Sequence, residues 1–407
     1  MLSIQLSKKA ETYLQRLCLE IPHRRVGSKG NQDATDFFAK KATSYGFKTD
    51  CTQFECLDWN QSGAHLTVEG EPFDALISPY SLGCHLIAPF SAASTFEELE
   101  TADTSDKILL LQGDIAREQL MPKNFTFYNP EHHQKIIHLL ETKAPLAIIA
   151  ATSRNPELAG GMYPFPLIED GDFDIPSVYM TDEEGDRLAK HLHKEISLVI
   201  NATRIPSTGC NVTARKGDAL DRRIVICAHI DSKEDTPGAL DNASGIAVLL
   251  LLAELFEDYS GGLGIEIVAL NGEDDYSAAG QVQYIRDNAD RLADVILAVN
   301  IDVAGYRQGN SAYSLYSCPE ELAGPIHKAF SSQKGIIEGE QWYQSDHMIF
   351  VQNQRPALAI TSDRFMELSA KITHTPRDTP DLVDHTKVAN IALALRDLLL
   401  EIDRSLA

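Results

Sequence analysis

Histidine and aspartate residues in the second half of the chain follow short apolar runs, and their side chains can bind divalent metal ions. The apolar runs cover residues 224–228, 264–270 and 295–301. In open α/β sheets, ligands bind at the carboxyl ends of such strands. The candidate metal ligands, in chain order, are His229, Asp241, Asp274, Asp302 and His374.

A pair of adjacent zinc ions would use this set of side chains efficiently. Each ion takes about four N or O ligands, and neighbouring ions usually share a carboxylate. Asp241 is the carboxylate able to bridge, which leaves one histidine and one further acid for each ion. Asp231, on the same strand as His229, is placed to orient that imidazole. Glu273, next to Asp274, is the candidate general base, which would take a proton from the attacking water and return it to a leaving amine.

Each of these residues also has an ordinary structural explanation. Asp241, in LDNASG, could cap a helix that Gly245 lets pack closely on the sheet. Glu273 could belong to a solvated acidic turn, Asp302 could simply end a strand, and His374 could be a turn histidine. Their joint occurrence in order, at strand ends or helix starts, favours the metal centre.

Composition limits the possible partners and location. The chain has 407 residues, with 36 Lys and Arg against 59 Asp and Glu, giving a net charge of -23. Such an acidic chain has no electrostatic footprint for nucleic acid or anionic membrane, so we expect neither partner. Oligomeric state is left open. The seven cysteines have no paired metal spacing, and no secretory signal or 18-residue apolar run is apparent, so we expect reduced thiols and a cytoplasmic location.

The elements that must position the site form a regular alternation after residue 206. Before it, helices are expected over 8–20 and 29–46, the second capped by Ser28. The intervening segment has short strands and helical stretches at 131–143 and 181–193. The expected later strands are 224–229, 264–270, 294–302, 312–317 and 357–361. The expected later helices are 242–257, 277–288, 319–333 and 385–403.

This alternation predicts an α/β fold with a mostly parallel central sheet flanked by helices. The sheet domain would comprise residues 1–55 and 206–407, with a β-rich domain inserted at 56–205. Seven histidines on polar helical stretches are expected to face solvent: His132, His133, His138, His191, His193, His327 and His385.

The motifs AHIDS, GALDNASG, NGED, NIDVAG, SDHMIF and HTPRDTPD resemble, in this order, those of the M28 zinc peptidases. The stretch RRVGSKGNQDATDFFAKKATSYGF is similar to that family's opening helix, and the inserted segment resembles a protease-associated domain without its cysteine-containing signature. The resemblance implies one metal on His229, Asp241 and Asp302, and a second on Asp241, Asp274 and His374. It also places Glu273 as the catalytic carboxylate and Asp231 as the residue that orients the histidine.

Two positions depart from the pattern of that family. Asp274 stands where glutamate is more usual, and Thr373 precedes His374 where several relatives have a tyrosine that can stabilise the oxyanion. Threonine is too short for that role, and losing an oxyanion donor costs about 2.7–4 kcal/mol. Another donor is therefore expected, and Tyr343 and His347 are the candidates, also for the substrate pocket.

Together these patterns predict a metallo-aminopeptidase that cleaves the N-terminal residue from peptides with two divalent ions, zinc or else cobalt or manganese. Metal dependence follows from the ligands, and the aminopeptidase direction from the resemblance. The alternatives are a carboxypeptidase or other amide hydrolase on the same scaffold, a glutaminyl cyclase, and a non-catalytic binding protein. Glutaminyl cyclases hold a single zinc and binding proteins tend to lose ligands, so the complete ligand set argues against both.

Overall fold

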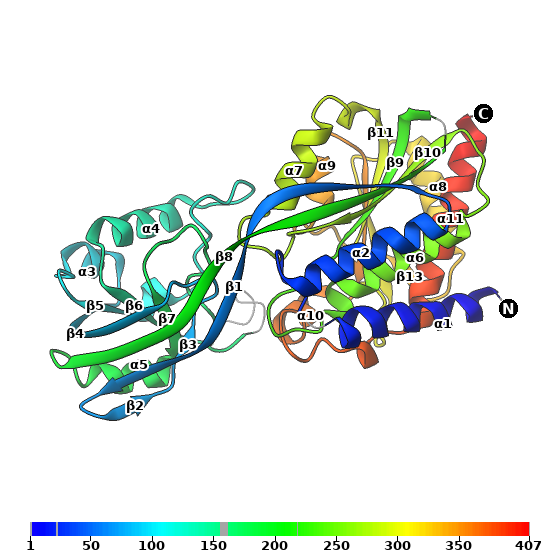
Figure 1. The fold of residues 1–407 in the computed structure, drawn as a ribbon. Coiled ribbons are helices and arrows are strands. Elements are labelled where there is room, and N and C mark those ends of the chain that lie inside the picture. The colour runs from blue at the N-terminus through cyan, green and yellow to red at the C-terminus, as the bar shows by residue number, and fades with distance from the viewer. Residues whose placement is uncertain (1, 22, 155–161, 218, 407) are drawn as a thin grey trace. The chain divides into compact units, whose positions relative to one another are not determined.

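The chain forms two compact units in the computed structural model, which describes residues 2–21, 23–154, 162–217 and 219–406 (Figure 1). The first unit contains Met1–Cys56, Ser207–Leu368 and Ile372–Ala407. The second contains Leu57–Pro206 and Ser369–Lys371. Apart from that last short segment, these boundaries differ by one residue from the expected domains.

The sheet of the first unit is mixed but mostly parallel, as predicted. Its strands follow the order β13-β12-β14-β11-β9-β10-β8, and β1 pairs with β8. Neighbours are parallel between β13 and β12, β14 and β11, β11 and β9, and β9 and β10, and antiparallel between β12 and β14 and between β10 and β8. The strands are β1 (Lys48–Val68), β8 (Glu195–Lys216), β9 (Ala219–His229), β10 (Leu263–Leu270), β11 (Val295–Ile301), β12 (Ser311–Tyr316), β13 (Ile336–Glu338) and β14 (Ala357–Ser362).

Strand β9 is apolar from Ile224 to Ala228 because both of its faces are covered. Ile224 and Ile226 belong to one hydrophobic core, while Val225 and Cys227 belong to a core on the opposite face. Covering both faces of a parallel sheet requires near-continuous apolar strands. This explains why the strands that carry the candidate ligands are so conspicuous in the sequence.

Helices cover both faces of this sheet. The larger core includes residues of α1 (Leu2–Gln15), α2 (Lys29–Ser44), α6 (Ser244–Leu255), α8 (Glu320–Ser331) and α11 (His385–Leu406), and the smaller one includes residues of α7 (Ala279–Asn288) and α9 (His347–Gln352). Helix α10 (Phe365–Lys371) follows β14. Among the described residues, no helix combines the length and apolar character that a membrane span requires.

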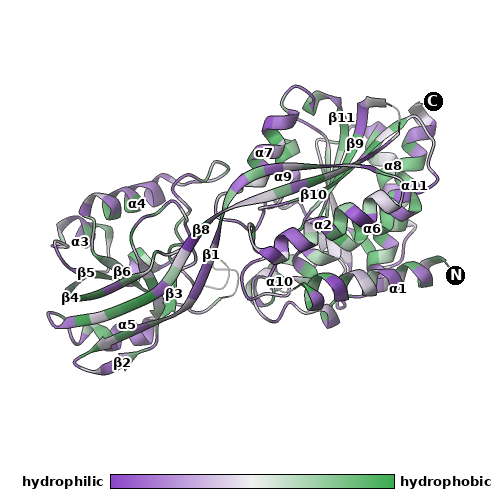
Figure 2. Ribbon diagram, in the orientation of Figure 1, coloured by the Kyte–Doolittle hydropathy of each residue, from purple (hydrophilic) through white to green (hydrophobic). Residues whose placement is uncertain are grey.

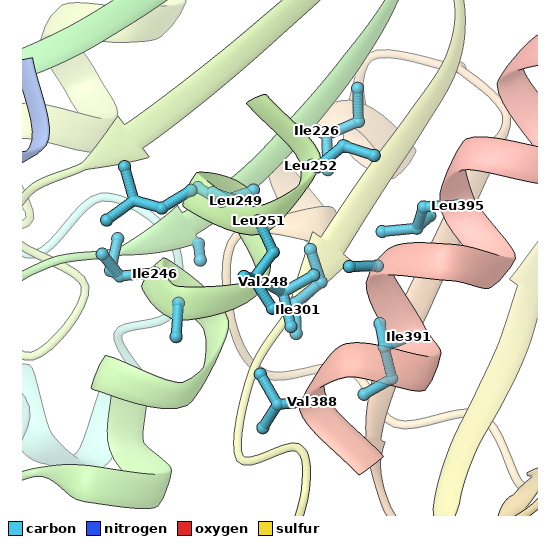
Figure 3. Packing of buried hydrophobic residues seen from close by; sticks show 14 of the residues in the cluster. Ile226, Ile246, Val248, Leu249, Leu251, Leu252, Ile301, Val388, Ile391 and Leu395 are labelled. Atoms are coloured by element: carbon cyan, nitrogen blue, oxygen red, sulfur yellow. The ribbon is translucent and has the colours of Figure 1, made fainter. Parts of the chain in front are cut away.

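Helix α6 lies at the centre of the larger core. Every residue from Ser244 to Ala253 is buried, and Figure 2 shows this helix as mainly hydrophobic, whereas hydrophilic residues are interspersed along α1 and α2. A helix that is apolar on all sides belongs in the interior. Val248 shares its core with Ile301 of the sheet and Val388 of α11 (Figure 3). Burying one such side chain contributes about 1.5–3 kcal/mol, so α6 is held firmly beside the site.

The helix starts show where local pattern succeeds and where it fails. Ser28 is the N-cap of α2, since its side chain accepts a hydrogen bond from the amide of Asn31 at 3.1 Å, as predicted. The first helix begins at Leu2, six residues before its expected start. The helix expected from residue 242 begins only at Ser244, because Asn242, with φ -137° and ψ 40°, is not helical. Short helices α9 and α10 were not predicted.

The second unit contains more strand than helix among its described residues, in line with the predicted β-rich segment. Its strands β4, β5, β6 and β7 form a parallel run of neighbours, and β3 closes it antiparallel to β7. Strands β5 and β6 are buried along their whole length, so they need helices as cover. Its elements are β2 (Glu71–Phe73), β3 (Leu76–Ile77), β4 (Cys84–Ala93), α3 (Phe96–Thr101), β5 (Ile108–Leu111), α4 (Glu131–Lys143), β6 (Ala147–Thr152), β7 (Ser177–Thr181) and α5 (Asp182–Ala189).

One histidine expected at the surface is buried. His133 is 4% exposed and lies on the inner face of α4 with Ile136, Ile137 and Leu140. These positions have the i, i+3, i+4, i+7 spacing of an apolar stripe. The prediction was wrong for His133 because it considered the polar composition of the helix and not this spacing. The other six histidines are partly or fully exposed.

The expectation of seven reduced thiols is wrong for two cysteines. Cys51 of β1 and Cys210 of β8 form a disulfide, with their Cα atoms 5.7 Å apart and 159 positions of sequence between them. Strand pairing brings them together, and spacing along the chain cannot reveal such a pair. The disulfide removes the cysteine-based argument for a cytoplasmic location, which stays a prediction.

Candidate metal centre

The candidate ligands lie at one edge of the sheet because parallel strands end there together. His229 is the last residue of β9 and pairs with Leu270, the last residue of β10. Asp274 follows β10 after a short turn, and Asp302 directly follows β11, with its amide donating to Ile360 of β14 at 2.9 Å. The regular sheet therefore places these side chains without any special loop.

Asp241 lies between the two histidines. Its Oδ1 is 3.0 Å from Nε2 of His229, and its Oδ2 is 3.2 Å from Nε2 of His374. Asp302 Oδ1 lies 3.4 Å from the first imidazole, and Asp274 Oδ1 lies 2.9 Å from the second. Each histidine thus faces one oxygen of the shared carboxylate and one further acid. The structure brings all five predicted ligands together in the pairing expected for two ions.

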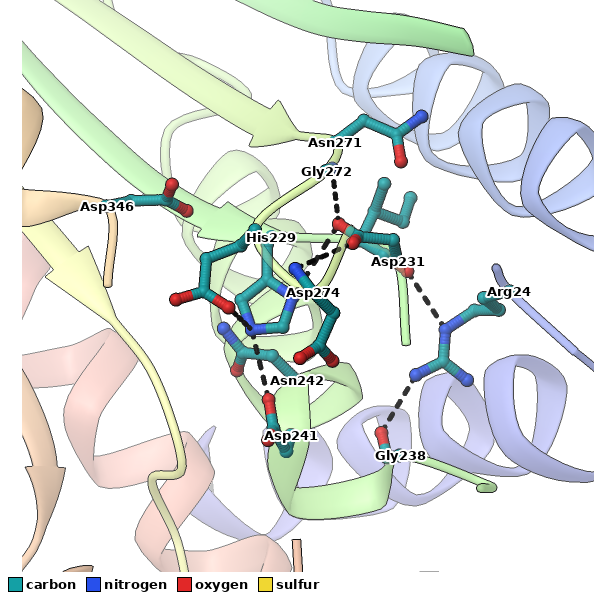
Figure 4. A network of polar contacts seen from close by, with 12 residues as sticks. Arg24, His229, Asp231, Gly238, Asp241, Asn242, Asn271, Gly272, Asp274 and Asp346 are labelled. Atoms are coloured by element: carbon teal, nitrogen blue, oxygen red, sulfur yellow. Dashed lines mark hydrogen bonds and ion pairs between the residues drawn. The ribbon is translucent and has the colours of Figure 1, made fainter. Parts of the chain in front are cut away.

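Asp231 lies at the ring nitrogen of His229 that does not face the other candidate ligands (Figure 4). Its Oδ1 is 3.7 Å from Nδ1 of His229. The same carboxylate accepts hydrogen bonds from the amides of Gly272, at 2.7 Å, and Asp274, at 3.0 Å. Asp231 therefore faces the histidine, as expected, and also fixes the turn on either side of Glu273, a role that the sequence did not suggest.

Glu273 lies beside the ligands rather than among them. Its side chain is 20% exposed, and its Oε2 is 3.9 Å from Nε2 of His229. Burial raises the pKa of its carboxyl well above the usual value, the charges of Asp302 and Asp274 raise it further, and His229 opposes the rise. A carboxylate with a raised pKa at the edge of a centre is suited to accept and return a proton.

The electrostatics of the cluster show an excess of negative charge. Burial alone would lower the pKa of His229, but Asp231, Asp241 and Asp302 outweigh burial and hold it well above its usual value. In His374 burial is likewise outweighed by Asp274 and Asp241. Burial raises the pKa of Asp302. A site in which carboxylates hold both imidazoles toward the charged form is one whose negative charge divalent cations would neutralise.

The residues fit a pair of divalent cations. His229 Nε2, Asp274 Oδ2 and Asp302 Oδ1 are buried without a hydrogen-bond partner, and an unpaired buried polar atom costs about 1–3 kcal/mol. Donor atoms of His229, Asp241 and Asp274 lie within 4.8 Å of one another. The ligand carboxylates of Asp241, Asp274 and Asp302, with Asp231 and Glu273 beside them, concentrate negative charge that divalent ions would offset. Nitrogen and oxygen donors of this kind suit zinc.

The two substrate-pocket candidates have different surroundings. Tyr343 is 63% exposed, and its hydroxyl donates to Gln341 at 2.9 Å. His347 is fully buried, and its Nε2 donates to the carbonyl of Trp342 at 2.9 Å. Burial lowers the pKa of His347 to about 4, so the neutral imidazole has its proton on Nε2 and cannot donate from Nδ1. Of the two side chains, only Tyr343 is exposed to solvent.

Several residues near the centre were missed by the sequence reasoning. Asp346 is buried next to His347, accepts from Gln281 at 2.6 Å, and has a pKa that burial raises to about 7. Asp378 is fully buried and bonds to the backbone that carries Asp241. Both acids stand inside the quoted motifs SDHMIF and HTPRDTPD, so the signal was present but was not assigned a role.

A second group of possible donors occurs in the other unit, where Glu118, His132 and His133 approach one another. His133 Nδ1 accepts a hydrogen bond from the amide of Met121 at 3.1 Å. Burial lowers the pKa of His133, so its ring is neutral with the proton on Nε2. That nitrogen lies 3.4 Å from Glu118 Oε1, and because it carries the proton it cannot bind a metal ion. Only two metal donors remain, and we assign no ion to this group.

The fold and the site define a metal-dependent hydrolase, with its metal-type ligands at the carboxyl edge of a helix-flanked α/β sheet. Residues 211–399, which contain all five candidate ligands and Glu273, match the model of Peptidase family M28. The part of the chain that carries the site is therefore similar to this family.

Similar proteins support the assignment. A zinc aminopeptidase from Bacillus subtilis has a TM-score of 0.75 and 18% identity, over 97% of this chain and 95% of that chain. An aminopeptidase from Aneurinibacillus sp. strain AM-1 has a TM-score of 0.73 and 22% identity, over 97% and 93% of the two chains. The probable leucine aminopeptidase 2 of Aspergillus fumigatus is 24% identical over 356 residues, which are 82% of this chain and 67% of that protein. The two structures establish the shared fold.

Proposed function

We propose that this protein is a zinc aminopeptidase that removes the N-terminal residue from peptides. The observation that carries the proposal is the position of Asp241, whose two oxygens face two imidazoles 3.0 and 3.2 Å away. A carboxylate shared in this way is what a two-ion centre requires. His229 and Asp302 would hold one ion with Asp241, and His374 and Asp274 would hold the other.

Two bound zinc ions supply a Lewis acid for the scissile carbonyl and a lowered pKa for the attacking water. Glu273 then performs the proton transfers: it takes the proton of the attacking water and returns it to the leaving amine. Asp231 keeps the imidazole of His229 in place and fixes the turn that carries Glu273 through the amides of Gly272 and Asp274. Tyr343 is the oxyanion donor in this proposal, because it is 63% exposed, whereas Nε2 of His347 already donates to Trp342.

The direction of cleavage is supported by the relatives. The protein from Aspergillus fumigatus is described as a probable leucine aminopeptidase, and the two structural neighbours as aminopeptidases. An aminopeptidase is therefore favoured over a carboxypeptidase on the same scaffold.

Blocked peptides test this proposal directly. One peptide is prepared in three forms: with both ends free, with an acetylated N-terminus, and with an amidated C-terminus. We expect the zinc-loaded protein to cleave the free and C-amidated peptides and to leave the N-acetylated one intact. Cleavage of the acetylated peptide at its C-terminal bond would instead indicate a carboxypeptidase. Elemental analysis of the same sample should give two zinc ions per chain.

The inserted unit and the location remain proposals of their own. We propose that residues 57–206 form a protease-associated-like domain, on the resemblance noted from the sequence. We also retain the cytoplasmic location as a prediction. Fractionation of the source cells, with an antibody against the chain, tests it, and recovery outside the cytoplasm would refute it.

A further inference from the structure

The bridging role of Asp241 depends on the backbone that carries it. Residues Ala239–Ala243 form a single irregular turn in which Asp241 is not helical. Its carboxylate must direct one oxygen to each imidazole, so a small rotation of this turn would break one contact or both. Something outside the turn must therefore fix its orientation.

Asp378 contacts this turn from the C-terminal segment. Its Oδ1 accepts from the amide of Leu240 at 2.8 Å, and its Oδ2 accepts from the amide of Asp241 at 3.0 Å. The backbone carbonyl of Asp378 accepts from the amide of Ala239 at 3.2 Å. Asp378 lies only four residues after His374. The segment that supplies one histidine therefore also grips the backbone of the shared carboxylate.

Arg24 contacts the same region from the N-terminal segment and is 1% exposed. Its Nε donates to the carbonyl of Ile230 at 3.0 Å, directly after His229. Its Nη1 donates to the carbonyl of Pro237 at 2.8 Å, just before the turn. Its Nη2 donates to the carbonyl of Gly238 at 2.9 Å (Figure 4). A planar guanidinium can hold several carbonyls in one fixed arrangement, which an ammonium cannot do.

We propose that Arg24 and Asp378 form a brace that positions Asp241, so that both cation sites of the proposed centre are formed together. Arg24 ties the end of the strand bearing His229 to the start of the turn, and Asp378 ties the turn to the segment bearing His374. The brace touches neither substrate nor the reacting atoms. Arg24 and Asp378 are positioning residues, and the inference rests on the proposed metal centre.

A buried ionic group elsewhere in the same sheet provides the matched control. Glu266 of β10 is fully buried and bonds to Arg215 at 2.9 Å and to the hydroxyl of Tyr284 at 2.9 Å. Neither Arg215 nor Tyr284 contacts a candidate metal ligand through these bonds. Glu266→Gln should therefore weaken the fold without a specific effect on the metal centre, whereas Asp378→Asn should affect the centre.

The experiment titrates zinc into the chelator-treated full chain by calorimetry and measures guanidinium unfolding of the same metal-free samples. In Asp378→Asn, the side-chain NH2 replaces one of the two carboxylate oxygens that accept hydrogen bonds from the amides of Leu240 and Asp241. Two donors then face each other, so the turn must rotate. Changing a group that orients a metal ligand costs about 10–100-fold in affinity, and we expect this loss for Asp378→Asn. Arg24→Lys should lose affinity in the same direction, and Glu266→Gln should keep the wild-type affinity.

Three results would overturn the inference. The first is wild-type zinc affinity in both Asp378→Asn and Arg24→Lys. The second is a loss that only follows the unfolded fraction, as in Glu266→Gln. The third is failure of both brace variants to fold, which would make the pair a requirement of the fold; if only Asp378→Asn fails, Arg24→Lys decides by the same comparison. If the wild-type protein binds no zinc, the proposed function itself is wrong. Normal zinc binding by the wild type, with a loss confined to the variants, therefore separates the two outcomes.

Discussion

Replacing Glu273 with glutamine separates catalysis from metal binding in this site. The carboxylate of Glu273 approaches His229 at 3.9 Å, farther than any of the four contacts between the imidazoles and the aspartates, which range from 2.9 to 3.4 Å. The ligand cluster does not need Glu273 to keep its arrangement. Glutamine has the same shape but cannot accept the proton of the attacking water.

General-base catalysis contributes about 10²–10⁴-fold, which corresponds to about 3–5 kcal/mol of transition-state stabilisation. We expect Glu273→Gln to lower kcat by this factor on an aminoacyl reporter substrate, with little change in KM. Elemental analysis should still find two zinc ions per chain. Glu254→Gln is the control, because Glu254 has a similar exposed fraction, 23% against 20%, but pairs with Lys9 away from the site.

The reasoning would be refuted by a variant that keeps kcat within about tenfold of the wild type while loaded with zinc. It would also be refuted if the variant lost its zinc, because Glu273 would then be a ligand and not the base. Unfolding curves of both variants must match the wild type, so that a loss of activity cannot come from unfolding.

Three further predictions test the metal, the packing and the buried histidine. Chelation should abolish activity and lower the unfolding temperature, and zinc at about 100 times its Kd should restore about 2.7 kcal/mol of stability in a thermal shift assay. Gly245→Ala should lower the free energy of unfolding in guanidinium by about 1–3 kcal/mol, since the added Cβ would lie 2.4 Å from Asn242 Oδ1. Gly262→Ala is the control: its Cβ would have nothing within 4 Å, so the free energy of unfolding should change by less than about 0.5 kcal/mol. His347 has its pKa lowered to about 4 when folded, so as the pH falls from about 6.5 to about 4 the unfolded chain takes up the proton first and about 3 kcal/mol of stability is lost. His347→Gln, which can still donate to Trp342, should flatten this part of the stability profile, and an unchanged slope would contradict the assignment.

The sequence by itself determined the strands and the order of the ligands. Because the strands are buried on both faces, they appear as unbroken apolar runs, and because they are parallel, the residues that follow them meet at one edge. Those two facts are enough to single out His229, Asp274 and Asp302 from the sequence. The alternation of apolar strands with helices predicted the central sheet and its helices, and the residue type of Ser28 predicted the cap of α2.

Only the tertiary structure decided which other residues support that site. Asp378 acts on Asp241 from 137 positions away, and Arg24 acts on Gly238 from 214 positions away, both through backbone groups. Contacts to backbone leave no pattern of residue types, since any residue offers an amide or a carbonyl. The disulfide between Cys51 and Cys210 could not be read from the sequence either, because strand pairing, and not spacing along the chain, brings the two cysteines together.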